Sequence, residues 1–234
     1  MTAPLFYVDR VATARVVLTG DDARHAGVLR LRGGEPVLVS DGKGRLGHGA
    51  VAAISPRRLE IEVDQVSAVP EPPVVRVVQG LPKGERGDLA VELLTETGAS
   101  EIVPWQSQRT VADWRGKEQT KLQRWQRVAR AAGMQSRRAY LPRILPLCTG
   151  LPDLVGQAFV LHEEADTDLF SVDPAAGPIT VVVGPEGGLT DHEAAAMQDA
   201  GARIVGLGTA IMRTSTAGAA ACVWIRGFEM RARA

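Results

Sequence analysis

The segment at residues 181–218 limits the possible folds more than any other part of the chain. Its apolar start, Val181–Val183, predicts a buried strand, which runs straight into Gly184-Pro185-Glu186-Gly187-Gly188, a turn sequence. Thr190 and Glu193 then have the spacing of a capping box, in which each side chain hydrogen-bonds to the other residue's backbone N–H. A strand, a glycine turn and a helix are therefore expected in immediate succession.

A second corner of the same kind follows. Gly201 is placed to end the first helix, and the stretch at 203–207 predicts another strand that enters a turn at Gly208. Residues 211–217 then open the last helix. Glycine permits positive φ and lets a ligand approach bare backbone, so both corners are candidate binding turns. Two tight turns without any ligand would give the same pattern.

The chain beyond residue 74 has the sequence pattern of an α/β domain. Strands are expected at 74–78, 102–103, 159–161, 179–183 and 203–207. One helix is predicted over 117–134, and another places Leu89, Leu93 and Leu94 on one face and stops at Gly98. Apolar strands that alternate with helices predict a largely parallel sheet covered on both faces.

Residues 1–70 look instead like a small β domain. Leu59–Val63 alternates between apolar and polar side chains, as a strand with one solvent-exposed face does. Val37–Val39 followed by Asp41–Gly44 predicts a strand and a hairpin turn. A short helix is expected near residues 21–28, with Thr19 or Asp21 as its cap.

A proline-rich segment separates the β region from the α/β region. Pro70-Glu71-Pro72-Pro73 cannot join a central sheet and favours extended linker backbone. The sequence therefore predicts two domains, at residues 1–70 and 74–234.

The net charge is zero, but its distribution is uneven. Residues 109–143 contain ten basic and two acidic side chains, whereas residues 144–234 contain five basic and eleven acidic ones. Clustered lysine and arginine bind nucleic acid by displacing its counterions, so the basic middle is a candidate RNA surface. A solvated helix face is the alternative.

Composition excludes several other classes. No run of eighteen apolar residues is present, and the first residues lack the pattern of a signal peptide, so a cytoplasmic protein without a membrane span is expected. Cys148 and Cys222 lie far apart and are expected to be free thiols. The four histidines do not have metal-ligand spacing, so no metal is expected. Trp105, Trp114 and Trp125 are candidates for stacking a flipped base, although packing is the commoner role.

The binding site is expected where three strands end: at 161–164, 184–188 and 207–213. A Walker loop is excluded because no lysine follows Gly188, and a GxGxxG fingerprint is absent from this turn. The residues alone do not identify the ligand, and nothing favours a phosphate over a phosphate-free nucleoside.

These blocks together resemble a known family. The GPEGG turn and the Leu207-to-Ala217 run are similar to those of the SPOUT methyltransferases, and more closely to the members that methylate N3 of a uridine in small-subunit ribosomal RNA. Further matching blocks are Pro82-Lys83-Gly84, Glu96-x-Gly98, Gln108-Arg109 and Gln135-x-x-Arg138. Ser215 departs from the pattern, because most members have glutamate there.

The resemblance implies a trefoil-knotted α/β domain, an N-terminal PUA-like β-barrel, S-adenosylmethionine as cofactor and a homodimer. The small residues at 216–221 would suit the dimer interface. The expected cofactor-binding residues are Leu161, His162, Glu163, Gly184, Pro185, Glu186, Gly187, Gly188, Leu207, Gly208, Ile211, Met212, Arg213, Thr214, Ser215 and Thr216.

Arg213 is the first candidate for catalysis, because a cation beside the cofactor turn would stabilise the anion formed when uridine loses its N3 proton. A structural ion pair is its alternative role. Glu163 and Glu186 are candidate general bases or cofactor ligands. The expected RNA-binding residues are Arg10, Arg30, Lys83, Arg109, Arg124, Arg127, Arg130, Gln135 and Arg138.

The resemblance therefore predicts an enzyme that methylates N3 of a uridine in small-subunit ribosomal RNA. Two alternatives stay open: a SPOUT enzyme that acts on another RNA or on a ribose 2′-oxygen, and a non-catalytic RNA-binding or ribosome-assembly protein.

Overall fold

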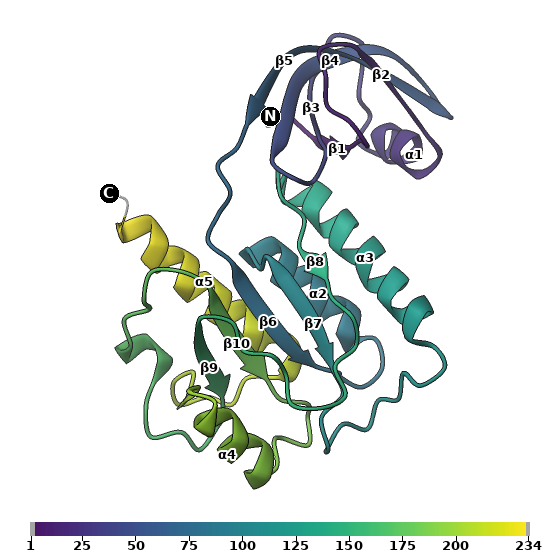
Figure 1. Ribbon diagram of the computed structural model, residues 1–234. Helices are drawn as coiled ribbons and strands as arrows, with labels where there is room; N and C mark the ends of the chain where they lie inside the picture. Colours follow the sequence, from purple (N-terminus) through teal and green to yellow (C-terminus); the bar gives the residue numbers. More distant parts are fainter. Residues whose placement is uncertain (1–2, 233–234) are drawn as a thin grey trace. The chain divides into compact units, whose positions relative to one another are not determined.

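The computed structural model describes residues 3–232 and divides them into two compact units (Figure 1). Unit 1 contains the chain up to Glu71 together with Gly133–Leu141. Unit 2 contains Pro72–Ala132 and the chain from Pro142 onward. The sequence pattern did not indicate that a second segment belongs to unit 1.

Unit 1 is a curled five-stranded sheet with one helix. Its elements are β1 (Leu5–Tyr7), β2 (Arg15–Thr19), α1 (Gly20–Val28), β3 (Pro36–Ser40), β4 (Arg45–Ser55) and β5 (Arg58–Ala68). The strand order is β1-β3-β4-β5-β2, and every pair is antiparallel except β1 with β3. The predicted strands, hairpin turn and helix are all present. Thr19 occupies the N-cap position of α1, but its side chain makes no capping hydrogen bond.

Two tyrosines hold the second segment of unit 1 in place. The Tyr7 hydroxyl donates to the carbonyl oxygen of Arg138 at 2.7 Å, and the Tyr140 hydroxyl donates to that of Val69 at 3.0 Å. Gly44 has a φ of 96° and leaves no space for a Cβ, because the Tyr140 ring packs directly against it. Gly133–Leu141 is thus part of the β module's own packing.

Unit 2 is built on a six-stranded sheet in which every strand pair is parallel. The strands are β6 (Val75–Gly80), β7 (Glu101–Trp105), β8 (Arg143–Ile144), β9 (Gln157–Leu161), β10 (Ile179–Val183) and β11 (Arg203–Val205), in the order β11-β9-β10-β6-β7-β8. The helices are α2 (Arg86–Thr97), α3 (Glu118–Gln135), α4 (Asp191–Asp199), α5 (Thr214–Ala232) and the short 3₁₀ helix η1 (Leu169–Ser171). The end of α3, from Gly133 onward, belongs to unit 1. The sequence predicted every one of these strands except the two-residue β8.

The helix α2 was predicted correctly, but its buried face was not. Leu94 is buried as expected, whereas Leu89 is 39% exposed and the face against the core also uses Ala90 and Val91. The partner of this face is α5, where Gly218 comes so close that a Cβ there would lie 3.1 Å from Leu94 Cδ2. The small residues at 216–221, expected at a dimer interface, therefore pack largely inside this chain.

An ion cluster around the buried Glu101 joins β6, β7 and β8 at their amino-terminal ends. Glu101 is 3% exposed, and its carboxylate accepts from Arg76 Nε at 2.6 Å and from Arg143. Burial raises the pKa of Glu101, but the hydrogen bonds from Arg76 and Arg143 outweigh it, so the pKa lies below the ordinary glutamate value. The folded state therefore favours the carboxylate.

The Glu101 cluster predicts an acid-dependent loss of stability. A lowered pKa stabilises the fold at pH values above the unfolded pKa, and this contribution disappears as the pH falls through the folded pKa. We expect Glu101→Gln to lower the free energy of unfolding by about 3 kcal/mol at pH 7, and by clearly less near pH 4. Urea unfolding at both pH values measures this.

Asp113→Asn is the matched control, because Asp113 pairs with Arg115 on the surface and exposed pairs contribute little. If Glu101→Gln lowered the free energy of unfolding equally at both pH values, the lowered pKa of Glu101 would not contribute to stability.

Cys148 and Cys222 do not form a disulfide, as predicted, and Cys222 is buried in α5. Within residues 3–232, no helix has both the length and the hydropathy that a membrane span requires.

Candidate functional site

The three strand ends that the sequence pointed to meet at one edge of the sheet. Leu161, Val183 and Val205 end β9, β10 and β11, and the strand pairing places them side by side. The loops that follow enclose two adjoining cavities of about 90 and 260 Å³. Both cavities are lined by Leu161, His162, Glu163, Ile211, Met212 and Ala217. They therefore form one site with two ends.

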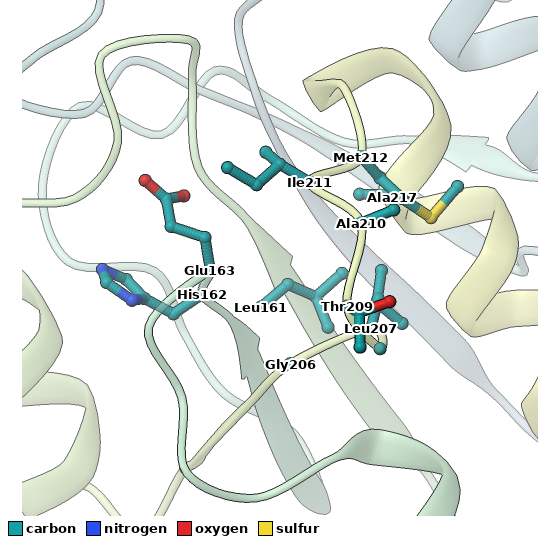
Figure 2. Close-up of a pocket in the computed structure, with 11 residues that line it drawn as sticks. Leu161, His162, Glu163, Gly206, Leu207, Thr209, Ala210, Ile211, Met212 and Ala217 are labelled. Atoms are coloured by element: carbon teal, nitrogen blue, oxygen red, sulfur yellow. The ribbon is translucent and has the colours of Figure 1, made fainter.

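Residues 206–212 form most of the wall of the smaller end. In Figure 2, Leu161 faces Leu207 and Thr209, and the Glu163 carboxylate lies on the side of Ile211. Two backbone hydrogen bonds hold this wall, from Gly206 N to Thr167 O at 2.8 Å and from Leu169 N to Gly206 O at 2.9 Å. The lining combines the apolar side chains of Leu161 and Leu207 with Gly206 and Gly208, which present only backbone.

The glycine turn at 184–188 forms the wall of the larger end. Gly188 has a φ of 70°, and its N–H donates to Pro185 O at 2.9 Å, which closes the turn. A Cβ on Gly187 would lie 2.9 Å from the carbonyl oxygen of Arg109, so this glycine makes room for backbone rather than for a ligand. Glycine is required at these two positions for different reasons.

Gly80, at the end of β6, is the glycine that the sequence reasoning missed. A Cβ there would lie 2.6 Å from Pro185 N and 2.7 Å from Val183 O. The chain can therefore bring the 184–188 turn against β6 only because this side chain is absent. The available signal was a glycine at the end of a buried strand.

Two glutamates near the turn hold loops in place. Glu186 Oε1 accepts from the backbone N–H of Lys83 at 3.0 Å. Glu193 completes the predicted capping box with Thr190 and also accepts from Gln108 N at 2.8 Å. Of the two carboxylates considered as general bases, Glu186 is thus engaged in a loop contact, and Glu163 lines both cavities.

The start of α5 closes the larger end. Arg213 is exposed, lines this cavity and comes directly before the helix. Its carbonyl oxygen accepts from the N–H groups of Thr216 and Ala217 in the first turn of α5. Ser215 lines the same cavity but is only 2% exposed. Arg86, at the start of α2, also lines this end and was not predicted, although it follows the Pro82-Lys83-Gly84 block.

Most of the expected cofactor-binding residues line one of the two cavities. They are Leu161, His162, Glu163, Gly184, Pro185, Glu186, Gly188, Leu207, Gly208, Ile211, Met212, Arg213, Thr214 and Ser215. Gly187 and Thr216 do not line either cavity. The Thr216 hydroxyl instead donates to Arg213 O at 3.1 Å.

The expected RNA-binding residues are divided between the two units. Arg10, Arg30, Gln135 and Arg138 belong to unit 1, and Lys83, Arg109, Arg124, Arg127 and Arg130 belong to unit 2. Arg124 forms an ion pair with Asp88 at 2.6 Å, and Arg109 donates to Gly187 O at 3.5 Å. These two arginines therefore have structural contacts of their own.

The three tryptophans are packing residues. Trp105, Trp114 and Trp125 are all at most 6% exposed. Trp114 and Trp125 pack edge to face with ring centroids 4.9 Å apart, and Trp105 Nε1 donates to Gly150 O at 2.8 Å. Stacking of a flipped base by these side chains is not compatible with their burial.

Comparison with known proteins gives consistent matches over nearly the whole chain. Family models described as an RNA methyltransferase domain and an RNA methyltransferase PUA domain match residues 70–226 and 18–64. A Mycobacterium tuberculosis protein named "Ribosomal RNA small subunit methyltransferase E" is 43% identical over 94% of this chain and 90% of its own. The Bacillus subtilis protein of the same name is 27% identical over 86% of this chain and 85% of its own.

A crystal structure of the Neisseria gonorrhoeae protein of that name, described as bound to S-adenosyl methionine, is similar with a TM-score of 0.85. It is 28% identical, and the match covers 97% of this chain and 98% of that chain. The predicted fold class, a SPOUT-type α/β domain with a parallel sheet and an N-terminal PUA-like β module, is confirmed.

Proposed function

This chain belongs to the ribosomal RNA small subunit methyltransferase E family, and on that premise we propose that it transfers a methyl group from S-adenosylmethionine to N3 of a uridine in small-subunit ribosomal RNA. The observation that carries the proposal is the two-ended cavity at the carboxyl edge of β9, β10 and β11. A family relative has been crystallised with this cofactor.

The chain's own residues fit the cofactor. The smaller end offers leucine side chains and bare backbone, which suit adenine and ribose. The larger end adds Arg86, Glu186 and Arg213, which suit a methionine tail that carries both charges. When bound, the cofactor supplies a methyl group on a positively charged sulfur, and that sulfur leaves as a neutral thioether.

The protein contributes alignment and electrostatics to this reaction. The glycine turns fix the ligand between β10 and α5, which holds the reacting atoms in line. Arg213 stands at the cavity with a full positive charge, where it would stabilise the anion that forms on the base. Glu163 is the carboxylate best placed to accept the N3 proton, because Glu186 is held by Lys83.

The partners in this proposal are small-subunit ribosomal RNA and a second copy of the chain, in the cytoplasm. The PUA-like unit 1 and the basic α3 are proposed to bind RNA. The homodimer is supported by α5, where Val223 and Met230 are 57% and 73% exposed and are seven residues apart, so they lie on one helix face.

A charge reversal on α3 tests the RNA surface. Arg127 is exposed, and the one contact described for its side chain is with Gln123 O in its own helix. We expect Arg127→Glu to weaken RNA binding and to reduce the slope of log K against log salt concentration by about 1, because one phosphate contact is lost. Arg203→Glu, an exposed reversal on β11, should leave the slope unchanged. An equal slope for both variants would mean that α3 is only a solvated face.

The direct test is methyl transfer by the purified protein. Small subunits or ribosomal RNA from a strain that lacks the gene are incubated with methyl-labelled S-adenosylmethionine, and the nucleosides are analysed by mass spectrometry. The proposal expects N3-methyluridine. A 2′-O-methylated nucleoside or a different RNA substrate would support another SPOUT activity. RNA binding without cofactor binding or methyl transfer would support a ribosome-assembly protein.

A further inference from the structure

The Ser215 hydroxyl is a buried polar group without a partner. Ser215 is 2% exposed, and among the residues that the structure describes its Oγ makes no hydrogen bond. Leaving a buried hydroxyl unsatisfied costs stability, so native proteins rarely retain one without a reason. The side chain lines the larger cavity, where a bound molecule could supply the missing partner.

Ser215 also occupies a position that favours negative charge. It is the second residue of the 19-residue helix α5, whose first N–H groups carry the positive end of the helix dipole. Arg86 and Arg213 line the same cavity. An oxygen that acquires negative charge here would meet a hydroxyl donor, a helix N-terminus and two guanidinium groups.

Gln79 fixes the position of this helix start. Its side chain is fully buried, and Nε2 donates to Thr214 O at 3.1 Å and to Gly80 O at 3.0 Å. The first residue of α5 is thereby tied to the end of β6. Ser215, the next residue of the helix and one of those that line the cavity, is thus held on a rigid support, as a preorganised donor must be.

We propose that Ser215 Oγ–H donates a hydrogen bond to the uracil carbonyl oxygen on which charge collects during methyl transfer. This rests on the proposed function. In that step the N3–H bond breaks and its proton passes to the Glu163 carboxylate. The N3 electron pair, shared with the flanking carbonyl oxygens, forms the bond to the methyl carbon, and the carbon–sulfur pair returns to sulfur.

The base has to enter the site at the larger cavity. The nucleoside of the cofactor is assigned to the smaller end, which residues 206–212 line. The larger end receives the methionine tail and is also the end that an incoming nucleotide reaches, because the side chains of Arg86, Glu186 and Arg213 are exposed there. The carboxylate of the cofactor is the competing partner for the Ser215 hydroxyl. A measurement of cofactor affinity distinguishes the two, because only a contact with that carboxylate would contribute to cofactor binding.

The test compares Ser215→Ala with the wild-type enzyme. Single-turnover methylation at saturating cofactor should slow roughly ten- to a hundredfold at neutral pH, near the effect of removing one oxyanion donor. The rate should recover as the pH rises, because a base that has already lost its proton needs less help. The dissociation constant for S-adenosylmethionine by calorimetry should change less than about threefold, because the lost interaction belongs to the transition state.

Two further variants exclude a purely structural role. Ser215→Cys keeps the volume but replaces the hydroxyl with a weak donor, so it should be slow like Ser215→Ala. Ser171→Ala, at an exposed serine outside both cavities, should keep the wild-type rate. Ser215→Ala should also be at least as stable as the wild type without ligand, because an unsatisfied group has been removed.

Three results would overturn parts of this picture. If Ser215→Ala keeps the wild-type rate at every pH, the hydroxyl has no part in the reaction. If cofactor affinity falls more than about tenfold while the saturated rate is unchanged, Ser215 binds the cofactor carboxylate. If the wild-type protein itself forms no N3-methyluridine, the proposed function fails before Ser215 is tested.

Discussion

Gly80→Val is expected to abolish cofactor binding. Even the first carbon of a side chain at this position would lie 2.6 Å from Pro185 N and 2.7 Å from the backbone at Gly184, and backbone atoms cannot rotate away as a side chain does. The 184–188 turn must therefore move off β6, and it forms one wall of the larger cavity. We expect affinity for S-adenosylmethionine to fall more than about a hundredfold, because displacements near 1 Å are costly at such sites.

The same substitution should lower the free energy of unfolding by about 1–3 kcal/mol, the usual effect of overpacking. Calorimetric titration with the cofactor measures the first effect, and urea unfolding measures the second. Gly150→Ala is the matched control, because no atom lies within 4 Å of its added Cβ. Tight cofactor binding by a folded Gly80→Val protein would show that the turn does not shape the site.

Arg213→Ala is expected to slow methyl transfer by roughly ten- to a thousandfold, the span for losing one preorganised donor. Arg213 lines the larger cavity beside the first turn of α5, and its backbone is held by Thr216 and Ala217. Arg213→Lys keeps the charge but loses the planar pair of donors, so it should recover little of the loss if the guanidinium meets one anion with two N–H groups.

Single-turnover methylation of small-subunit RNA separates this effect from binding. The cofactor dissociation constant should change much less than the rate, since the interaction strengthens only as charge develops. Arg203→Ala removes an exposed arginine from β11 and should keep the wild-type rate. If both Arg213 variants also kept the wild-type rate of methyl transfer, Arg213 would have a structural role. Arg10 and Arg138 would then be the next arginines to test.

The sequence predicts the parts of this fold whose cause is local. The capping box of Thr190 and Glu193 forms because two side chains three residues apart can reach each other's backbone. Gly98 ends α2 with a φ of 103° because few other residues adopt that conformation readily. The strands β6 and β10 are almost completely buried and are apolar apart from Arg76, Gln79 and Thr180, a pattern typical of strands that are covered on both faces.

Features that depend on a distant partner escaped prediction. Nothing near Gly80 shows that Pro185 packs against it. Leu89 has the helical spacing of a core residue, but α5 covers the neighbouring face of α2, so this leucine stays partly exposed. Arg86 lines the cavity only because the 184–188 turn comes close to the start of α2. Each of these contacts is set by tertiary packing.

The connectivity of unit 1 has a consequence for the order of folding during synthesis. The chain passes from unit 1 to unit 2 after Glu71, returns at Gly133 and leaves again after Leu141. The β module therefore lacks the contacts of Tyr140 with Val69 and Gly44 until residue 140 has left the ribosome. A fragment that stops at residue 71 would be an unfinished domain. The last contacts of the amino-terminal unit form only after β6, α2, β7 and the whole of α3 have been made.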